Sequence, residues 1–529
     1  MKLLTILAMT CLATPGFTQE TEVAPQKKLA SVPADRAAGH DSINPKDCKS
    51  WLSILASDEF GGRGTGRPGY EKAARYVAGK FESWGLEPFG DDGTFFQHVP
   101  YSITAPVAEK CWLALQDAEG KELHRLEYGK SFAGEIAAST DKELELVVVN
   151  AKDGKAFADV ELKGKAVLLI DRSDARARGF SRMTMSLYRK SPAAMIVVDD
   201  KLAKASPSSL GRVTFDGASG RRRQPRQRPN RYAVTLETAT ALLKKAGVDA
   251  AILESKEDQV LDVPGKIHAH VVVEKKKVFG ANVVARLVGS DPQLKDEYIG
   301  IGSHLDHIGT NARGVVNNGA DDDGSGTTGV LAVARAFTKN GQRPRRSILF
   351  MCFSGEEMGL LGSGYYVANP KVPNKQMVAE LQMDMIGRNE EKVDRRTGEV
   401  TEKPEDNLNS LHLVGTKKLS DELHELCLDV NKRFVGFDFE YDEEGVFSRS
   451  DHANFAKKDI PIAFFFTGFH PQYHRPNDTV DRIDFPKLSR VAKLCYLIGF
   501  ELAQRDTGPK VDRTWADFQK SQSSGRRRR

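Results

Sequence analysis

Two adjacent carboxylates follow an apolar run in the second half of the chain, within "FSGEEMGLLGS" (353–363). The preceding run, "SILFMCF" (347–353), is typical of a buried strand, so Glu356 and Glu357 stand where such a strand ends. A solvated surface pair is the simplest interpretation of two neighbouring like charges. The alternative is a division of labour, in which one carboxylate binds a metal ion and the other transfers a proton.

Further polar residues gather where other apolar runs end. Ligand sites in open α/β sheets lie at the carboxyl ends of strands, so segments of this kind are expected to meet in the folded chain. Together they offer two imidazoles and several carboxylates, which suit two borderline metal ions such as Zn²⁺. The segments are "SHLDH" (303–307), "GADDDGSG" (319–326), "SGEEMG" (354–359), "QMDM" (382–385) and "YHRPNDT" (473–479).

Each of these residues alone also has a structural interpretation. A single histidine such as His304 is more often a hydrogen-bonded structural residue than a ligand. One of the aspartates 321–323 is expected to cap a helix, although three adjacent carboxylates repel one another and a cation would relieve that repulsion. Asp384 lies in an apolar strand, where an unpaired charge is costly. The combination of segments, rather than any one residue, predicts the metal centre.

The order of these motifs resembles that of the co-catalytic di-zinc aminopeptidases of metallopeptidase family twenty-eight, which includes bacterial leucyl aminopeptidase and aminopeptidase Y. The segment "ASDEFGGRGTGRPGYEKAARYV" (56–77) is similar to the N-terminal part of that family. The segment "SDHANFAKKDIPIAFFFTG" (450–468) is similar to the stretch before its last metal ligand. The resemblance covers about 45–103 and 278–505.

The resemblance implies two Zn²⁺ ions per chain and a position for each ligand. His304 and Asp384 would hold one zinc ion. Glu357 and His474 would hold the second ion. Asp322, the middle aspartate of the triplet, would bridge the two.

The resemblance also implies residues that act on the substrate or orient the ligands. Glu356 would accept a proton from the water that bridges the two metal ions. It would then pass this proton to the departing amine. Tyr473 stands where the family has a tyrosine that helps to polarise the scissile carbonyl. Asp306 would orient the imidazole of the first histidine ligand, and Asp478 is expected to do the same for the last one.

Strands and helices alternate from residue 278 onward, which predicts an α/β fold. The near-continuous apolar strands indicate a sheet covered on both faces. The resemblance implies a mixed, mostly parallel central sheet flanked by helices, of the zinc exopeptidase (phosphorylase/hydrolase-like) type. This peptidase domain is expected to comprise residues 45–103 and 278–507.

The stretch between these two parts, residues 104–277, is rich in short β-type runs and contains no clustered His, Asp and Glu typical of a catalytic site. Its segments "ADVELKGKAVLLIDR" and "KSPAAMIVVDD" resemble an inserted α+β protease-associated domain. Such a domain is expected to shape substrate access and to perform no catalysis. Its basic loop 220–230, "GRRRQPRQRPN", departs from that resemblance.

The N-terminus, "MKLLTILAMTCLATPGFTQE", is typical of a secretory signal peptide over residues 1–18, so we expect export to the periplasm or the extracellular space. Lipoprotein anchoring through Cys11 is an alternative. A flexible leader is expected over 19–44 and a basic tail over 508–529. After signal cleavage no segment reaches the length of an integral membrane span.

The charge balance does not indicate a nucleic-acid partner. Lys and Arg number 77 and Asp and Glu 72, so the net charge of the 529-residue chain is only +5. The six cysteines include no CxxC pair, and five remain after signal cleavage, which argues against a disulfide framework. We expect peptides as the partners of this chain, and buried thiols for Cys352 and Cys495, which stand in apolar runs.

The function expected from these observations is a secreted zinc exopeptidase that removes N-terminal residues from peptides. Carboxypeptidases, dipeptidases and glutaminyl cyclases share the fold, so each stays an alternative. A binding protein on an inactive peptidase scaffold, as in transferrin receptor, is a further alternative, although that form loses metal ligands. Phe447, Phe466 and Phe469 are candidates to line an apolar substrate pocket, and core packing is their more common use.

Overall fold

A computed structural model describes most of the chain. The expected signal peptide (1–18) and all but the last two residues of the basic loop 220–230 lie outside the described residues. In the part that is described, no helix is both long and apolar enough to cross a membrane. The described residues are 29–173, 182–205, 210–217, 229–394 and 396–526.

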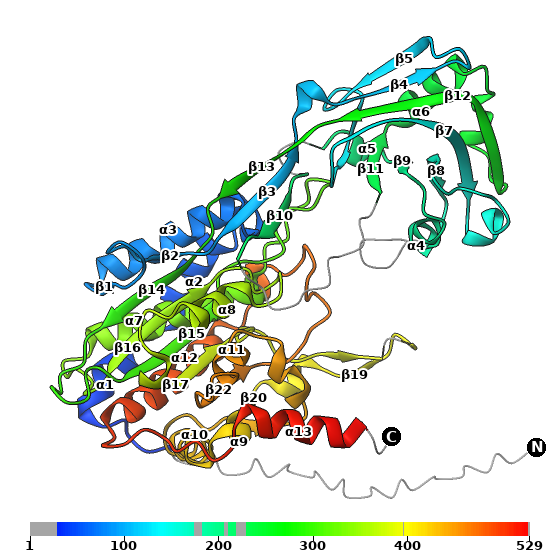
Figure 1. Cartoon of the computed structure of the whole chain (residues 1–529). Coiled ribbons are helices and arrows are strands. Elements are labelled where there is room, and N and C mark those ends of the chain that lie inside the picture. The colour runs from blue at the N-terminus through cyan, green and yellow to red at the C-terminus, as the bar shows by residue number, and fades with distance from the viewer. Residues whose placement is uncertain (1–28, 174–181, 206–209, 218–228, 395, 527–529) are drawn as a thin grey trace, which may run out of the picture.

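A nine-stranded mixed sheet forms the centre of the larger part of the molecule (Figure 1). The pairs β15–β16, β15–β17 and β17–β22 are parallel, while β14 and β20 add antiparallel partners on either side. This confirms the mixed, mostly parallel α/β sheet expected from the sequence. In spatial order the strands are β1 (Glu87–Pro88), β14 (Ala281–Leu287), β16 (Ser347–Phe353), β15 (Tyr298–His304), β17 (Met377–Met383), β22 (Ile462–Phe466), β20 (Ser410–Val414) and β21 (Asp438–Glu440), with β2 (Phe96–His98) also paired to β14.

Helices cover both faces of this sheet, which explains why its strands are apolar at nearly every position. In β16, Ile348 and Phe350 belong to one buried cluster, whereas Leu349 and Met351 belong to another on the opposite face. One face carries α1 (Ala34–Ser42), α2 (Pro45–Leu55), α3 (Pro68–Ser83), α7 (Gly326–Lys339), α10 (Asp421–Phe434) and α12 (Phe485–Gln504), and the other carries α8 (Leu361–Ala368), α9 (Thr416–Leu419), α11 (His452–Ala456) and α13 (Trp515–Arg526).

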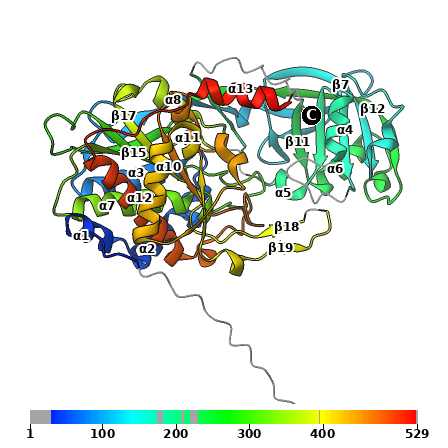
Figure 2. The ribbon, with the colours of Figure 1, turned by 90° about the horizontal axis from the view of Figure 1, so that it is seen from below.

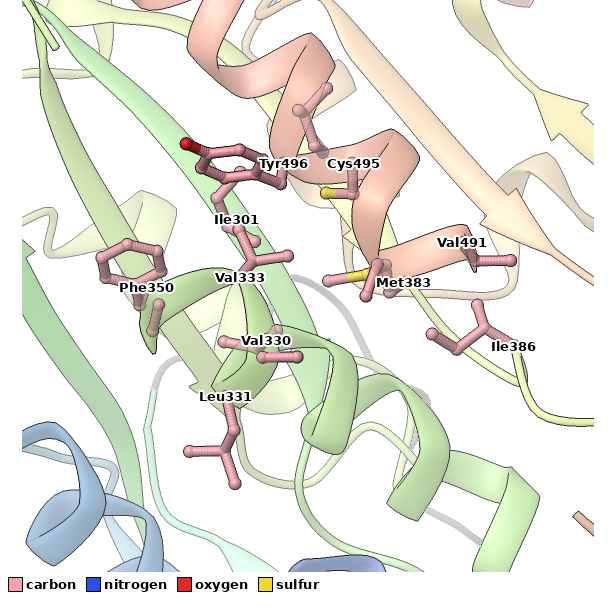
Figure 3. Close-up of a cluster of buried hydrophobic side chains, with 14 of the residues drawn as sticks. Ile301, Val330, Leu331, Val333, Phe350, Met383, Ile386, Val491, Cys495 and Tyr496 are labelled. Atoms are coloured by element: carbon pink, nitrogen blue, oxygen red, sulfur yellow. The ribbon is translucent and has the colours of Figure 1, made fainter. Parts of the chain in front are cut away.

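The core beneath the sheet is built where α7 and α12 meet (Figure 3). Phe337 of α7 lies with its ring centroid 4.9 Å from that of Tyr496 in α12 and 6.0 Å from that of Phe350 in β16. Helix α12 begins at a local signal, because the side chain of Asp484 accepts the backbone N–H of Lys487 and a proline occupies the first turn. These two helices fix the strands whose ends carry the polar segments.

A second, eight-stranded sheet lies to one side of the central sheet in both overall views (Figures 1 and 2). It has its own buried clusters and is joined to the first sheet through the three-stranded ladder β10 (Arg212–Phe215), β3 (Tyr101–Pro106) and β13 (Val273–Val278). Its order is β5 (Glu122–Glu127), β4 (Trp112–Gln116), β12 (Gln259–Val271), β7 (Thr140–Ala151), β8 (Ala166–Asp171), β9 (Ala194–Val198), β11 (Asn230–Val234) and β6 (Phe132–Glu135), with α4 (Arg182–Arg189), α5 (Asp200–Ala203) and α6 (Leu236–Lys245) packed against it.

The flexible leader expected over residues 19–44 is wrong for its second half, because Ala34–Ser42 forms helix α1. The helix packs tightly against α12: a Cβ added at Gly39 would lie 2.2 Å from the hydroxyl oxygen of Tyr496. The guanidinium of Arg36 in α1 forms a salt bridge of 2.7 Å with Glu501 of α12. The polar composition of the expected leader did not predict this contact, because a glycine rather than an apolar residue makes it.

The C-terminal tail expected over 508–529 also contains ordered structure, because α13 spans Trp515–Arg526. The rings of Trp515 and Phe518 pack against Phe447, with centroids 5.7 and 5.0 Å away. Phe447 is therefore a core residue under α13. The five cysteines outside the signal region are buried free thiols, as expected for Cys352 and Cys495.

A buried histidine makes the stability of the fold depend on pH. His452 in α11 stacks on Phe464 and hydrogen-bonds the backbone oxygen of Phe447, and burial lowers its pKa to about 3. Between pH 6.5 and 3 the unfolded chain therefore binds one more proton, so the free energy of unfolding should fall by about 1.4 kcal/mol for each pH unit of acidification.

His452→Gln should remove this slope, because glutamine keeps a hydrogen-bond donor and does not titrate. The measurement is urea unfolding of both proteins in EDTA at pH 7, 6, 5 and 4. The difference between wild type and variant should shrink, or reverse sign, as the pH falls. An equal difference at every pH would contradict the assignment.

Candidate metal centre

The polar segments meet because the strands that carry them are parallel. His304 is the last residue of β15, Asp384 follows β17 directly, and Glu356 and Glu357 follow β16 after a two-residue link. β22 runs parallel to β17, and the loop after it carries His474. Parallel neighbours end at the same edge of a sheet, so these side chains share one site.

The five residues predicted to bind metal lie together around Asp322. One carboxylate oxygen of Asp322 is 3.2 Å from Nε2 of His304, and the other is 3.0 Å from Nε2 of His474. The His304 nitrogen also lies 3.6 Å from an oxygen of Asp384. The His474 nitrogen lies 3.0 Å from an oxygen of Glu357. Each imidazole thus faces two carboxylates, and Asp322 stands between the two groups.

These separations fit metal ligands. A tetrahedral zinc ion with bonds of about 2.0–2.1 Å keeps its ligand atoms about 3.3 Å apart, close to the distances around Asp322. In addition, Oδ2 of Asp322 and Oε1 of Glu357 are buried and have no hydrogen-bond partner among the described atoms. A buried carboxylate oxygen without a partner is costly, and a cation would satisfy it.

The pKa values of the side chains show that the site favours positive charge. Burial lowers the pKa of His474, but the carboxylates of Asp322 and Glu357 outweigh burial and raise that pKa to about 10. Burial would raise the pKa of Asp322, yet His304, His307 and His474 hold it well below its usual range. A metal ion binding here must displace these protons.

The neighbours of Asp322 in the triplet point elsewhere. Asp323 accepts three backbone N–H groups, those of His304, Gly326 and Met385, at 2.8–3.1 Å. Asp321 accepts the backbone N–H of Gly387 at 2.7 Å. Both oxygens of Asp323 and one of Asp321 are bonded to the backbone of loops, and Asp322 is the member of the triplet that faces both His304 and His474.

Asp306 contacts His304, but through a different group from the one expected. Nδ1 of His304 lies 2.9 Å from the backbone oxygen of Asp306, whereas the nearest carboxylate oxygen is 3.9 Å away. The carboxylate instead accepts the hydroxyl of Thr65 at 2.7 Å and the backbone N–H of Glu356 at 3.1 Å. Asp306 therefore links the first histidine to the loop that carries the paired glutamates.

Asp478 does not lie where the sequence placed it. Its carboxylate accepts the backbone N–H groups of Asp321 and Asp322 at 3.1–3.2 Å, and no hydrogen bond to His474 is present among the described residues. Its position in the chain, four residues after that histidine, indicated the wrong partner. It holds the turn that presents Asp322.

Glu356 and Tyr473 flank the centre. An oxygen of Glu356 is 4.0 Å from Nε2 of His304, and burial together with nearby carboxylates raises the pKa of Glu356 well above its usual range. The ring of Tyr473 stacks on His474 with centroids 3.9 Å apart. Arg449 donates to the Tyr473 hydroxyl at 3.3 Å.

Sequence reasoning missed two residues of the site. His307 lies with Nδ1 2.8 Å from Oε1 of Glu357 and 3.7 Å from Oδ2 of Asp322, so it is either a donor to Glu357 or a further ligand. Arg63 is fully buried and donates to backbone oxygens in three separate segments. Both stood in quoted motifs, His307 as the second histidine of "SHLDH" and Arg63 within "FGGRGTGRPGY".

A cavity opens beside the centre. Phe466 and Phe469 line it, as the sequence indicated, whereas Phe447 does not. Its other lining residues outside the metal-facing group are Met385, Val446, Arg449, Phe464 and Tyr473. This wall is largely apolar and aromatic, which is typical of a small-ligand pocket.

Comparison with known proteins identifies the class. Residues 282–498, which contain every site residue predicted from the sequence, match the model of Peptidase family M28. The solved structure of a zinc aminopeptidase from Bacillus subtilis has the same fold, with a TM-score of 0.52 and 18% identity over 90% of this chain and 99% of that one. Residues 282–498 are therefore similar to Peptidase family M28.

Curated relatives match this region in part. A probable leucine aminopeptidase from Arthroderma otae is 30% identical over 220 residues, which are 40% of this chain and 56% of that protein. Leupeptin-inactivating enzyme 1 from Streptomyces exfoliatus is 31% identical over 190 residues, 36% of each chain. The chain thus spans about half the length, or less, of these relatives.

Arg63 gives a stability test of the scaffold behind the site. Besides Leu55 and Leu305 at 2.9 Å, its guanidinium donates to the backbone oxygens of Asn318 and Gly319 at 2.7 Å. Arg63→Met would leave several buried carbonyls without donors, so the free energy of unfolding should fall by about 3 kcal/mol or more.

Chemical denaturation of the variant measures this loss. Arg313→Met is the control, because Arg313 forms an exposed pair with Asp199 and should cost less than about 1 kcal/mol. Equal small losses in both variants would show that the carbonyls around Arg63 find other donors.

Proposed function

We propose that the chain is a zinc aminopeptidase with two Zn²⁺ ions, which removes N-terminal residues from peptides. The observation that carries this proposal is the position of Asp322, whose two oxygens lie 3.0–3.2 Å from imidazoles at residues 304 and 474. The names of the curated leucine aminopeptidases support the same activity. They cover part of the chain only, so the activity of the whole protein stays a proposal.

The residues divide into two ligand sets that share Asp322. His304 and Asp384 hold one ion, and His474 and Glu357 hold the other. Zinc at these positions lowers the pKa of the attacking water and polarises the scissile carbonyl. His307, whose Nδ1 lies 2.8 Å from one oxygen of Glu357, would keep the second oxygen directed at the centre.

Glu356 performs the proton transfers in this proposal. Its backbone N–H is held by Asp306, and its carboxylate lies beside the ligand set of His304 without entering it. From there it accepts a proton from the attacking water and returns it to the leaving amine nitrogen. Tyr473 places its hydroxyl at the wall of the same cavity, where it donates to the scissile carbonyl oxygen.

The cavity wall favours an apolar side chain at the N-terminus of the substrate. Phe464, Phe466 and Phe469 line it together with Val446 and Met385, so a leucine or phenylalanine side chain would remove aromatic and aliphatic surface from water. This preference agrees with the names of the leucine aminopeptidases, and the wall itself is the argument for it in this chain.

We further propose that residues 104–277 are a protease-associated domain inserted into a peptidase domain of 45–103 and 278–507. One contact would couple it to the centre. Arg313, in the loop after His307, pairs with Asp199 at the end of β9. Movement of this domain would thus reach the substrate cavity, in keeping with a gating role. Export through the N-terminal signal belongs to the same proposal.

One observation favours a dipeptidase or carboxypeptidase as the second candidate. Arg449 is exposed at the cavity, where its guanidinium lies 4.9 Å from the ring centroid of Phe469. A guanidinium beside the reacting centre can bind a substrate's C-terminal carboxylate. An enzyme that depends on this contact would require short substrates with a free C-terminus.

The paired glutamates should differ in what they contribute. Glu356→Gln should keep the zinc content of the wild type but lower kcat by about 10²–10⁴-fold, because it removes the proton acceptor and no ligand. Glu357→Gln should lower the zinc content, because it removes a ligand. Elemental analysis and steady-state kinetics on both variants make the measurement. Equal zinc loss in the two variants would contradict the assignment.

Substrate ends should distinguish the candidate functions. Leucine anilide should be hydrolysed, N-acetyl-leucine anilide should not, and a chelator should abolish hydrolysis until zinc is restored. A dipeptide and its C-terminal amide separate the second candidate: an aminopeptidase accepts both with similar kcat/KM, whereas loss of the amide alone would show that Arg449 reads the carboxylate. Hydrolysis that survives chelation would contradict the metal centre.

A further inference from the structure

A second cluster of carboxylates and histidine lies at the other side of the cavity wall, and the proposed peptidase reaction does not use it. It is built by Glu390, His412 of β20, Glu440 of β21 and Asp442. Lys392 of the hairpin β18 (Lys392–Val393) and β19 (Val400–Glu402) also enters it. Figure 1 shows this hairpin projecting from the sheet edge.

The three residues Glu390, His412 and Glu440 converge on one point. Nε2 of His412 lies 3.2 Å from an oxygen of Glu390 and 3.5 Å from an oxygen of Glu440. One ligand atom from each residue falls within 4.8 Å of the others. These separations match the ligand spacing of about 3.3 Å in a tetrahedral zinc site, as do those around Asp322.

The existing cations do not satisfy the cluster. Lys392 is shared among Glu390, Glu402 and Asp442, at 2.9–3.3 Å from each. One lysine therefore faces several carboxylates, and Oε1 of Glu390, whose side chain is 1% exposed, has no hydrogen-bond partner among the described atoms. Burial of an unpaired carboxylate oxygen is unfavourable unless a cation balances it.

The imidazole of His412 gives the second, independent observation. It is fully buried, and carboxylates face both of its nitrogens, since Nδ1 lies 3.2 Å from an oxygen of Asp442. Nδ1 nevertheless has no hydrogen-bond partner among the described atoms. A neutral imidazole carries its proton on one nitrogen only, so with the proton on Nδ1 towards Asp442 the lone pair of Nε2 points to Glu390 and Glu440, where it can bind a metal ion.

We propose that Glu390, His412 and Glu440 bind a divalent zinc-type ion, separate from the centre at Asp322. The imidazole selects a borderline metal over calcium or magnesium, which prefer all-oxygen sites. Glu440 is one-third exposed, so an ion and a water ligand can enter from its side. Lys392 lies 3.3 Å from the Glu390 oxygen that also faces His412, and 2.9–3.0 Å from Glu402 and Asp442.

The ion would stabilise the sheet edge and, through it, the wall of the cavity. His412 is paired with Phe466 across β20 and β22, and their rings lie 5.6 Å apart. The residue after Glu390 donates its backbone N–H to the oxygen of Phe469 at 2.9 Å. Phe466 and Phe469 line the cavity, so a metal at His412 would order two side chains of the apolar wall.

Two matched variants test the proposal on the full chain. Glu440→Gln removes a ligand at the cluster edge. Glu402→Gln removes the same charge from a side chain of similar exposure. Glu402 contacts Lys392 and Asn407, and no ion pair with His412 is found among the described residues. The measurements are zinc content per chain after dialysis against limiting zinc, and the rise in Tm when zinc is added to the metal-free protein.

The wild type should hold one more zinc ion per chain than Glu440→Gln, and the variant should lose part of the zinc-dependent rise in Tm. Glu402→Gln should retain both. The same one-ion difference should appear in a Glu357→Gln background, so the result does not depend on the proposed peptidase centre or on activity. Equal zinc content and equal Tm rise in all three proteins would overturn the proposal.

If Glu440→Gln lowers the Tm of the metal-free protein, Asp442→Asn provides a second comparison, because Asp442 is more than half exposed and faces the other nitrogen of His412. It should keep the zinc ion, since its oxygen lies at Nδ1 rather than at the converging point. Zinc loss in Asp442→Asn without loss in Glu440→Gln would contradict the assigned ligand set.

Discussion

The structure of the candidate metal centre depends on one constraint: several carboxylates of like charge are held close together in a buried site. Asp384 follows the end of β17, Glu356 and Glu357 follow the end of β16, and Asp322 lies just before α7. Burial opposes the charge of Asp322, Glu356 and Glu357. The histidines between them supply part of the balancing charge, as the raised pKa of His474 shows. The fold holds the carboxylates there through backbone contacts that need no metal, such as those to Asp323 and Asp478. The result is a preorganised site in which the negative charge of the carboxylates is only partly balanced.

The sequence predicted the parts of the fold that depend on composition and order. Apolar runs such as 347–353 became strands of the parallel core, because strands covered on both faces need apolar residues at every position. His304 and His474, which are 170 positions apart, were expected to meet because strand ends share one edge, and they do lie on the two sides of Asp322. Helix α1 escaped prediction, since its contact depends on Gly39 and on a partner more than 400 residues away.

Contacts made by backbone groups could not be predicted from the sequence either. Asp306 was expected to orient a histidine with its carboxylate, but it does so with its carbonyl oxygen. Arg63 is held by carbonyl oxygens, and every residue type has one, so no pattern of side chains marks its partners. His307 was visible as a second histidine three residues after the first, and its contact with Glu357 became evident only once the loops were placed.

The central claim is that two metal ions share the carboxylate of Asp322. Crystals grown with zinc and measured at the zinc absorption edge test it most directly, through anomalous difference density. The account predicts two peaks about 3.5–4 Å apart, one near His304 and Asp384 and one near His474 and Glu357. A single peak, or two peaks of which neither contacts Asp322, would contradict it.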